Sequence, residues 1–487
     1  MNYRLIIIYF FTSIIYTQEN LPRVNLSLED AIMLAKKQSI DYLSAKNGAE
    51  VGYWGYKSYI SNFFPSVNIS GILPNYQRSI NRITADNGTD TFISQNQAFS
   101  SLSLEINQIV PFTGGEFTIS SSLDRIDVFS SPGFVNYSST PLSIQYSHES
   151  LLYNPYKWQK EIEPLILEES KREFQEKLED ISLKTTTLFF DYLLAEVKSK
   201  NALNNKVSQD TIYNISKGRF NIGKLYENDL LQSELSLLNS KEELIKSKNE
   251  LKLAKQTFLD QLRIKNDVNF NLVTPEELIF IKIDSIQLFE KALSGRKLLV
   301  QHEREVLEAK QEISKIKSDD IKVGIRGNFG LSQQNNFLNE VYSNLLSQQN
   351  FSLTVSAPIF TWGKRKADKK IATSNLELIK SENEQELLTA KRELNLKYLE
   401  WNQLEISSQI SKRASEIAVK RYESAKRRFS IGKVTLTDLN IAQKEKDDAL
   451  FNYFQSLREY WELYYELRKL TLYDFIKNKN IYSNSNN

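Results

Sequence analysis

The segment Arg219-Phe220-Asn221-Ile222-Gly223-Lys224 recurs 209 residues later as Arg428-Phe429-Ser430-Ile431-Gly432-Lys433. An Asp-Leu pair follows each copy, at Asp229-Leu230 and Asp438-Leu439, and seven of the twelve positions are identical. Both copies lie between long, charged, amphipathic segments. A repeated turn between long helices indicates an internal duplication, so we expect a fold of two similar halves.

The segments that flank these turns are predicted to be long helices. Residues 158–217 contain no glycine, and residues 364–430 contain neither glycine nor proline. In the second segment, apolar residues spaced by three, four or their sums form one stripe of a helix, consisting of Leu376, Ile379, Leu387, Ala390, Leu394, Trp401 and Leu404. A helix of about 65 residues would be ~98 Å long, which favours a coiled-coil arm or a tubular assembly over a compact domain.

Shorter segments alternate strictly between apolar and polar residues. They cover residues 102–107, 117–120, 142–146, 322–331 and 351–355. Such segments are typical of membrane-type strands, with an apolar face toward lipid and a polar face toward a lumen. A soluble antiparallel sheet with one buried face would show the same pattern, so the strands alone leave both alternatives open.

The two halves differ in length between their strands. One strand of each half aligns at the offset of 209 residues, but upstream residues 67–71 align with residues 323–327 at an offset of 256. The difference of 47 residues is extra chain in the first half, and it contains a tight-turn sequence at residues 111–115. We therefore predict an additional hairpin at about residues 98–124.

Each half is predicted to contain a helix, strands and a long helical hairpin. Ser27 is a plausible N-cap for the first helix, and its counterpart in the second half begins near Ser285. The predicted organisation is a signal peptide (1–17), a first repeat (18–264), a linker (265–284), a second repeat (285–477) and a polar, disordered tail (478–487).

The N-terminus has the features of a secretory signal. Arg4 is followed by an apolar stretch that ends near Tyr16, and we expect cleavage near Thr17-Gln18. The alternative is a buried N-terminal helix or strand.

Composition excludes several classes of protein. The 62 basic and 60 acidic residues nearly cancel, so bulk charge does not favour nucleic-acid binding. The absence of cysteine excludes disulfides and thiolate metal sites. The two histidines, His148 and His302, are not in a ligand-spaced cluster. We expect no enzyme activity, no catalytic residues, no metal and no cofactor.

The duplicated tip motif, the junction at residues 357–365 and the opening at residues 27–32 together resemble the TolC-like outer membrane efflux protein family. The resemblance implies a homotrimer of mixed α and β structure, in which the strands form a transmembrane β-barrel and the long helices form a periplasmic tube. It implies a passive exit channel for efflux or type I secretion in the outer membrane of a Gram-negative bacterium. The implied partners are outer membrane lipid, a periplasmic adaptor (membrane fusion) protein and, through the adaptor, an inner-membrane pump of the RND, ABC or MFS class.

The chain departs from the family pattern in two respects. The extra hairpin gives six strands per chain where four are usual, so either the barrel is larger or the hairpin lies outside its wall. The N-terminal cysteine of lipidated members is absent.

The residues of the repeated tip suggest specific roles. Gly223 and Gly432 suit a left-handed helix end, while Asp229 and Asp438 fall in the first turn of the next helix, where negative charge is favourable. An apolar side chain that recurs at a solvent-facing end suggests a partner surface. By resemblance, the adaptor docks at Arg219, Phe220, Gly223, Lys224, Arg428, Phe429, Gly432 and Lys433. The resemblance also places Asp229 and Asp438 at the periplasmic gate, although Ile441 replaces the second acidic ring residue.

Two other functions are compatible with the sequence. One is a secreted, soluble coiled-coil scaffold without channel activity, and the other is a module that binds a ligand between its halves. Aromatic residues near the strand ends fit the girdles of a membrane protein and so favour the channel: Phe63, Phe64, Phe99, Phe112, Tyr153, Tyr156, Phe360 and Trp362.

Overall fold

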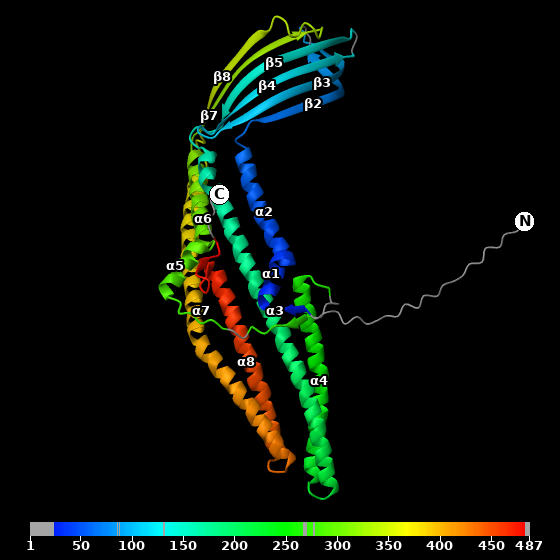
Figure 1. Cartoon of the computed structure of the whole chain (residues 1–487). Coiled ribbons are helices and arrows are strands. Elements are labelled where there is room, and N and C mark those ends of the chain that lie inside the picture. The colour runs from blue at the N-terminus through cyan, green and yellow to red at the C-terminus, as the bar shows by residue number, and fades with distance from the viewer. Residues whose placement is uncertain are drawn as a thin grey trace, which may run out of the picture.

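The computed structural model describes residues 24–84, 86, 88–129, 132–265, 270–275 and 278–482. The chain is elongated, with a curved β-sheet at one end and long helices that run from it to two turns at the other end (Figure 1). The predicted signal peptide and residues 483–487 of the predicted tail lie outside the described residues.

The helices form two sets in the same order. They are α1 (Leu28–Gln38), α2 (Ile40–Ser61), α3 (Pro155–Asn221) and α4 (Glu227–Leu262), then α5 (Ser285–Gly295), α6 (Leu298–Ser318), α7 (Lys364–Ser430) and α8 (Leu436–Thr471). Both α3 and α7 contain 67 residues, and both α4 and α8 contain 36. The duplication predicted from the turns therefore continues through both long hairpins. Among the described residues, none of the helices combines the length and the apolar character that crossing a lipid bilayer requires.

The long strands form one antiparallel sheet, called the large sheet below. In the described part of the chain, its six strands lie in the order β2 (Ser66–Thr84), β3 (Asp90–Val110), β4 (Gly115–Val128), β5 (Phe134–His148), β7 (Lys322–Asn335) and β8 (Leu346–Ser356). The additional hairpin of the first half consists of β3 and β4, and both strands pair inside the sheet. The extra hairpin is thus part of the sheet and does not lie outside it.

Two short strand pairs complete the fold. β1 (Val24–Leu26) pairs in parallel with β6 (Phe270–Leu272), which joins the beginning of the chain to the segment between the halves. β9 (Tyr473–Asp474) pairs with β10 (Lys479–Asn480). This last pairing lies partly inside the segment predicted to be disordered, so the prediction does not hold for residues 478–482.

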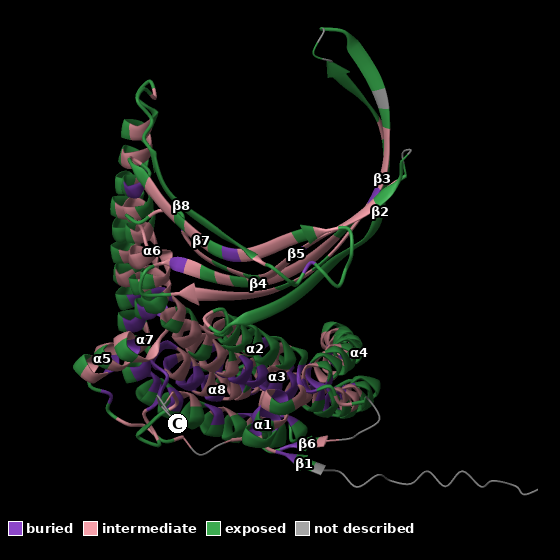
Figure 2. Cartoon of the chain, turned by 90° about the horizontal axis from the view of Figure 1, so that it is seen from above, coloured by how far each residue is buried: buried purple, intermediate pink, exposed green. Residues whose placement is uncertain are grey.

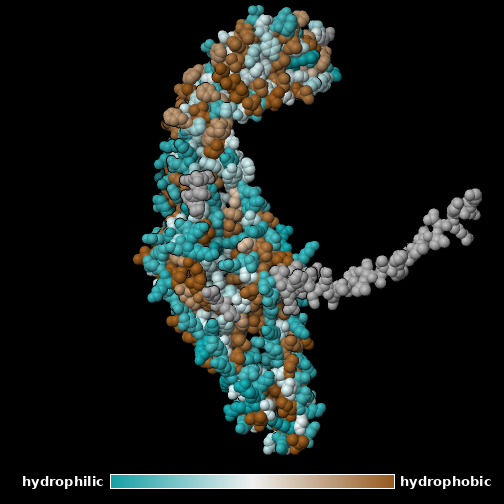
Figure 3. Space-filling model, in the orientation of Figure 1, coloured by the Kyte–Doolittle hydropathy of each residue, from teal (hydrophilic) through white to brown (hydrophobic). Residues whose placement is uncertain are grey.

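The two faces of the large sheet differ in chemistry, as the alternating pattern predicts. One register row is apolar from β2 to β7 and ends in Gln349 on β8; its apolar members are Val67, Ile106, Ile119, Ile144 and Phe329. The adjacent row, on the opposite face, consists of Ser66, Asn107, Thr118, Gln145, Asn328 and Asn350. Hydrophobic side chains cover much of the sheet surface seen in Figure 3. The large sheet therefore exposes an apolar face that none of the described helices covers.

Both edges of the large sheet are unpaired in the part of the chain that the structure describes. The outer strands β2 and β8 are exposed along nearly their whole length. The sheet curves away from the helices, so that its two edges lie far apart (Figure 2). Unpaired edge strands present free N–H and C=O groups and are templates for pairing with another chain.

The main hydrophobic core lies among the helices and not against the sheet (Figure 2). It includes Phe189 of α3, Phe258 of α4, Leu288 of α5 and Tyr460 of α8, all fully buried. Part of the apolar stripe predicted on α7 contributes to it, because Leu394, Trp401 and Leu404 are buried there. This core joins the two halves at the middle of the helical part. The lower ends of the hairpins are in contact through a smaller buried cluster.

Candidate functional site at the helix tips

The two turns at the lower end have the same backbone geometry. At the first tip, the N–H of Lys224 donates to the carbonyl of Arg219 (2.9 Å), and the N–H of Gly223 donates to that of Phe220 (2.9 Å). The second tip repeats both bonds at the equivalent residues. Gly223 has a φ of 71°, and Gly432 has a φ of 76°. These are Schellman ends, and they confirm that each glycine leaves its helix in the left-handed conformation.

The helices that follow the tips begin differently. At α8 the Thr435 hydroxyl accepts from the N–H of Asp438 (3.1 Å), and the Asp438 carboxylate accepts from the N–H of Thr435 (3.3 Å), which forms a capping box. At α4 the N-cap is Tyr226, which makes no side-chain cap bond, although Asp229 lies in the first turn. The hydrogen bonds from the side chain and backbone of Thr435 lower the pKa of Asp438. Asp438 therefore has a structural role at its helix start that Asp229 lacks.

We predict that the two tips respond in opposite ways to changes of their caps. Thr435→Ala should weaken the start of α8 by about 1 kcal/mol, and Tyr226→Thr should stabilise the start of α4 by a similar amount. Hydrogen exchange of the first-turn amides should become faster in the first variant and slower in the second. Because the folded-state pKa of Asp438 is lowered, its stabilising effect is present above its ordinary pKa of about 3.9 and is lost as the pH falls through the lowered pKa. Equal exchange rates in both variants and the parent protein would contradict this role.

The two tip phenylalanines do not have the same exposure. Phe220 is 38% exposed, whereas Phe429 is only 6% exposed and packs with Ile212 of α3 and Leu439 of α8. The expectation of an exposed phenylalanine at each tip is therefore wrong for the second tip. Phe429 is buried because α3 of the first half lies beside the end of α7, a contact between halves that the local sequence does not encode.

Arg219 connects the two tips. Its Nη2 donates to the carbonyl oxygens of Phe429 (3.2 Å) and Ser430 (3.1 Å), and its guanidinium lies 5.6 Å from the centre of the Phe429 ring. These carbonyls belong to the last turn of α7, where a helix has unpaired acceptors and partial negative charge. The equivalent Arg428 is exposed and makes no such bond among the described residues. One arginine from the first half thus binds the end of the second tip, next to the packing of Ile212 on Phe429 and Leu439.

Above the tips, polar side chains form the contact between the first and second hairpins. Gln209 donates to Asn440 (3.2 Å) and to Gln443 (3.0 Å), and Asn205 donates to Asp447 (2.6 Å). Exchange of such bonds for bonds to water costs little net free energy. This contact, called the polar seam below, can therefore separate at lower cost than the hydrophobic core above it.

The predicted docking residues lie together on the two adjacent turns. Lys224, Arg428 and Lys433 are exposed, and none of them forms an ion pair within the described parts of the chain. Asp438 is exposed as well, and Asp229 is half-buried. The end of the molecule thus presents cationic side chains around a small apolar cluster.

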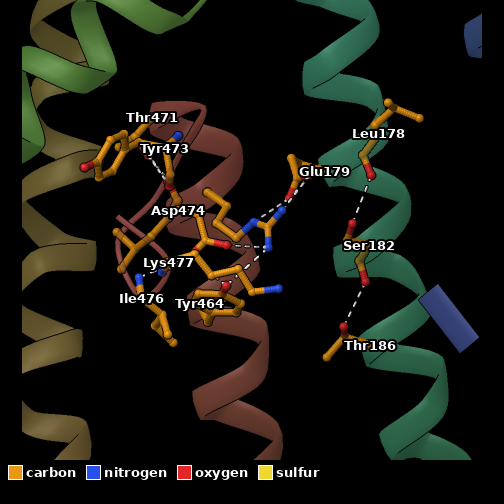
Figure 4. Close-up of polar contacts among 12 residues, drawn as sticks. Leu178, Glu179, Ser182, Thr186, Tyr464, Thr471, Tyr473, Asp474, Ile476 and Lys477 are labelled. Atoms are coloured by element: carbon orange, nitrogen blue, oxygen red, sulfur yellow. Dashed lines mark hydrogen bonds and ion pairs between the residues drawn. The ribbon is translucent and has the colours of Figure 1, made fainter. Parts of the chain in front are cut away.

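The sequence analysis missed a buried ionic cluster in the middle of the helical part. Glu179 of α3, only 1% exposed, contacts Lys36 of α1 (2.8 Å) and Arg468 of α8 (2.9 Å). Arg468 also contacts Asp474 (3.2 Å), which accepts from the Tyr464 hydroxyl (2.9 Å). Figure 4 shows Asp474 and Tyr464 facing Glu179 across the gap between α8 and α3. The sequence signal for this cluster is a charged residue, Glu179, on an otherwise apolar face of a predicted helix.

The electrostatics of this cluster follow from burial. Burial lowers the pKa of Lys36, and the Glu179 carboxylate opposes that shift. Burial alone would also lower the pKa of Arg468, but Glu179, Tyr464 and Asp474 together outweigh burial and raise it. The charges are therefore retained because each has an opposite partner.

The two histidines, as possible catalytic residues or metal ligands, make only packing or surface contacts among the described residues. His148 is buried, and its Nε2 lies 2.7 Å from the carbonyl of Thr113. His302 lies 2.9 Å from the Glu386 carboxylate. No group of three or more potential metal ligands occurs among the residues that the structure describes.

Comparison with known proteins identifies relatives of this fold. Residues 288–471 match the family model described as outer membrane efflux protein. The CmeC outer membrane channel of Campylobacter jejuni is similar, with a TM-score of 0.66 at 14% identity, over 91% of this chain and 85% of that one. The outer membrane protein VceC of Vibrio cholerae has a TM-score of 0.63 at 11% identity, over 91% and 95%. The MtrE outer membrane channel of Neisseria gonorrhoeae, in its open state, has a TM-score of 0.62 at 15% identity, over 91% and 88%. No curated protein has significant sequence similarity to the chain.

Proposed function

We propose that the chain is a passive exit channel of a tripartite efflux or secretion system, because residues 288–471 match the family model described as outer membrane efflux protein and the fold is that of outer membrane channels. Three copies combine their sheets into a barrel in the outer membrane and their helices into a periplasmic tube. The channel performs no chemistry and transports cargo only when its helical end is open.

The observation that carries the proposal is the large sheet. It exposes an apolar face, and each of its edge strands β2 and β8 has one side without a partner strand among the described residues. In water, an uncovered apolar face and two free edges favour aggregation. Lipid would cover the apolar face, and β2 of one copy would pair with β8 of the next copy. A soluble scaffold would leave the apolar face uncovered and the edges unpaired.

The helical part supports assembly through its outermost helices. α4 and α7 lie at opposite sides of the helical layer (Figure 1). Each carries exposed apolar residues at spacings of three, four or seven, typical of a coiled-coil seam: Leu231, Leu235, Leu238 and Ile245 on α4, and Leu399, Ile406, Ile410 and Ile417 on α7. We assign these stripes to contacts between neighbouring copies, α4 against α7.

The tips are proposed as the regulated end. Adaptor docking is assigned to the two turns, with Phe220 as the exposed apolar contact and Lys224 and Lys433 as cationic contacts. Asp229 and Asp438 would line the entrance in the closed state. The polar seam allows the second hairpin to move away from the first when an adaptor binds.

The test is the mass and conductance of the native protein. We expect extraction from outer membranes only with detergent, a protein mass of about three chains of 56.5 kDa by light scattering, and conductance in planar bilayers. A monomer that is soluble without detergent, or a trimer that never conducts, would contradict the channel function.

A further inference from the structure

The junction between β8 and α7, residues 357–363, has unusually exposed apolar side chains. Ile359 is fully exposed, Trp362 is 89% exposed and Phe360 is 69% exposed. Phe360 and Trp362 contact each other edge to face with ring centres 4.5 Å apart. Exposure of three large apolar side chains in one short segment indicates a surface that binds a partner.

The backbone of the junction points to the same conclusion. Trp362 has a φ of 51°, in the left-handed region that a large side chain rarely adopts. Holding it there costs on the order of 1 kcal/mol or more, and no burial within the chain offsets that cost.

The duplication supplies an internal comparison. The first-half counterpart of Trp362 is Tyr153, which is half-buried and accepts a hydrogen bond from Gln311 (3.3 Å). The next residue, Asn154, donates to the carbonyls of Pro111 (2.8 Å) and Phe112 in the β3–β4 turn. The extra hairpin thus braces the first junction, whereas the second junction has no equivalent cover.

Basic side chains follow the second junction immediately. Lys364, Lys366 and Lys370 are exposed and form no ion pair or side-chain hydrogen bond within the described ranges. Positive charge at a helix N-terminus opposes the helix dipole, so stability of α7 does not account for these lysines. Arg365 and Lys369 differ, because both pair with Asp320.

The junction continues the apolar face of the large sheet. Val355, at the end of β8, pairs with Val323 of β7 next to the junction. Aromatic side chains followed by lysines, at the rim of an apolar band, match the interface between lipid chains and headgroups. Over six residues α7 extends about 9 Å, a distance comparable with the thickness of a headgroup layer.

We propose that the junction residues Ile359, Phe360 and Trp362, together with Lys364, Lys366 and Lys370, bind anionic phospholipid in the membrane leaflet that faces the helices. The inference rests on the proposed membrane location. The aromatic side chains enter the acyl-chain boundary, and the lysines bind the phosphates. Charge complementarity favours an anionic lipid over a second copy of the chain, because the lysine cluster requires negative charge next to the aromatic pair.

Tryptophan quenching in lipid vesicles tests the proposal. The trimer is reconstituted with acyl-brominated phosphatidylglycerol or phosphatidylcholine, and the Trp362 signal is the difference between the parent and Trp362→Phe. We expect quenching of Trp362 with a preference for phosphatidylglycerol. In a variant with Gln at positions 364, 366 and 370, that preference should fall by about fivefold or more, given ~1 kcal/mol for each basic residue near the surface. The matched control replaces Lys391, Lys412 and Lys420, exposed on the same helix farther from the sheet, and should keep the preference.

The outcomes separate this proposal from the channel function. A conducting trimer whose Trp362 is not quenched would overturn the lipid site. In that case the neighbouring copy, and not lipid, would cover the junction. Equal quenching by the two lipids would overturn the anionic preference. A protein that enters neither kind of vesicle and does not conduct would overturn the channel and the lipid site together.

Discussion

Replacement of Glu179 by leucine is expected to destabilise the folded protein by about 3–5 kcal/mol. The side chain is buried between α1, α3 and α8, where it contacts Lys36 and Arg468. Removal of the carboxylate leaves two largely buried cations next to each other. The midpoint of guanidinium unfolding, followed by tryptophan fluorescence in detergent, should fall clearly.

The size of this effect follows from what remains after the change. Arg468 keeps Asp474 as a partner (3.2 Å), but Lys36 keeps none of its recorded contacts. Glu179→Gln is a sharper variant, because it preserves the shape and removes only the charge. It should lose most of the same stability, since an amide cannot compensate two cations.

An exposed ion pair on the same type of helix provides the control. Glu416 contacts Arg413 on the surface of α7 (2.8 Å), and exposed pairs contribute at most about 1 kcal/mol. Glu416→Leu should therefore leave the unfolding midpoint nearly unchanged. Equal midpoints for the Glu179 and Glu416 variants would show that the buried cluster does not stabilise the fold.

Local sequence patterns predict the helices and strands of this protein better than they predict the contacts between them. The predicted helix 364–430 coincides with α7, because glycine at residues 363 and 432 marks both ends and the intervening residues keep a helical period. The extra hairpin was predicted from one turn and from two alternating segments that have the spacing of strands. These signals act over a few residues and are readable without knowledge of the neighbours.

The contacts between the halves could not be predicted in this way. Whether Phe429 is buried depends on Ile212, and whether Arg219 reaches the end of α7 depends on how two hairpins lie side by side. Helical periodicity assigns a side chain to a face and does not say which helix covers that face. The capping box of Thr435 and Asp438 is different, because its signal, the spacing Thr-x-x-Asp, is local and lies in the sequence itself.

Removal of the arginine that joins the tips is expected to open the channel. Arg219→Ala abolishes two charge-assisted hydrogen bonds to α7 and the stacking on Phe429. Bonds of this type contribute about 1.5–3 kcal/mol each. If their loss affects only the closed arrangement, the ratio of open to closed channels should rise at least about tenfold. Single-channel recording in planar bilayers measures that ratio directly.

The duplicated sequence provides the control for this experiment. Arg428 is the equivalent arginine of the second tip, is exposed, and makes no bond to the first half within the described residues. Arg428→Ala removes the same charge from the same end of the molecule, so it should leave the open fraction close to that of the parent. Similar recordings for both variants would mean that the charge of the tips, and not the bond between them, determines opening.

A conservative substitution separates bonding from charge at Arg219 itself. Lysine keeps the positive charge near the end of α7 but lacks the planar fork that reaches two carbonyls at once. Arg219→Lys should therefore give an open fraction between those of the parent and Arg219→Ala. The polar seam above the tips explains why one residue can have this influence: Gln209 and Asn205 can exchange their partners on α8 for water at low cost. Once the arginine bond is lost, the packing of Ile212 against Phe429 and Leu439 is the apolar contact left near the tips, and the main hydrophobic core is the next restraint between the hairpins. An open fraction for Arg219→Lys equal to that of the parent would assign the effect to charge alone and contradict a specific bond between the tips.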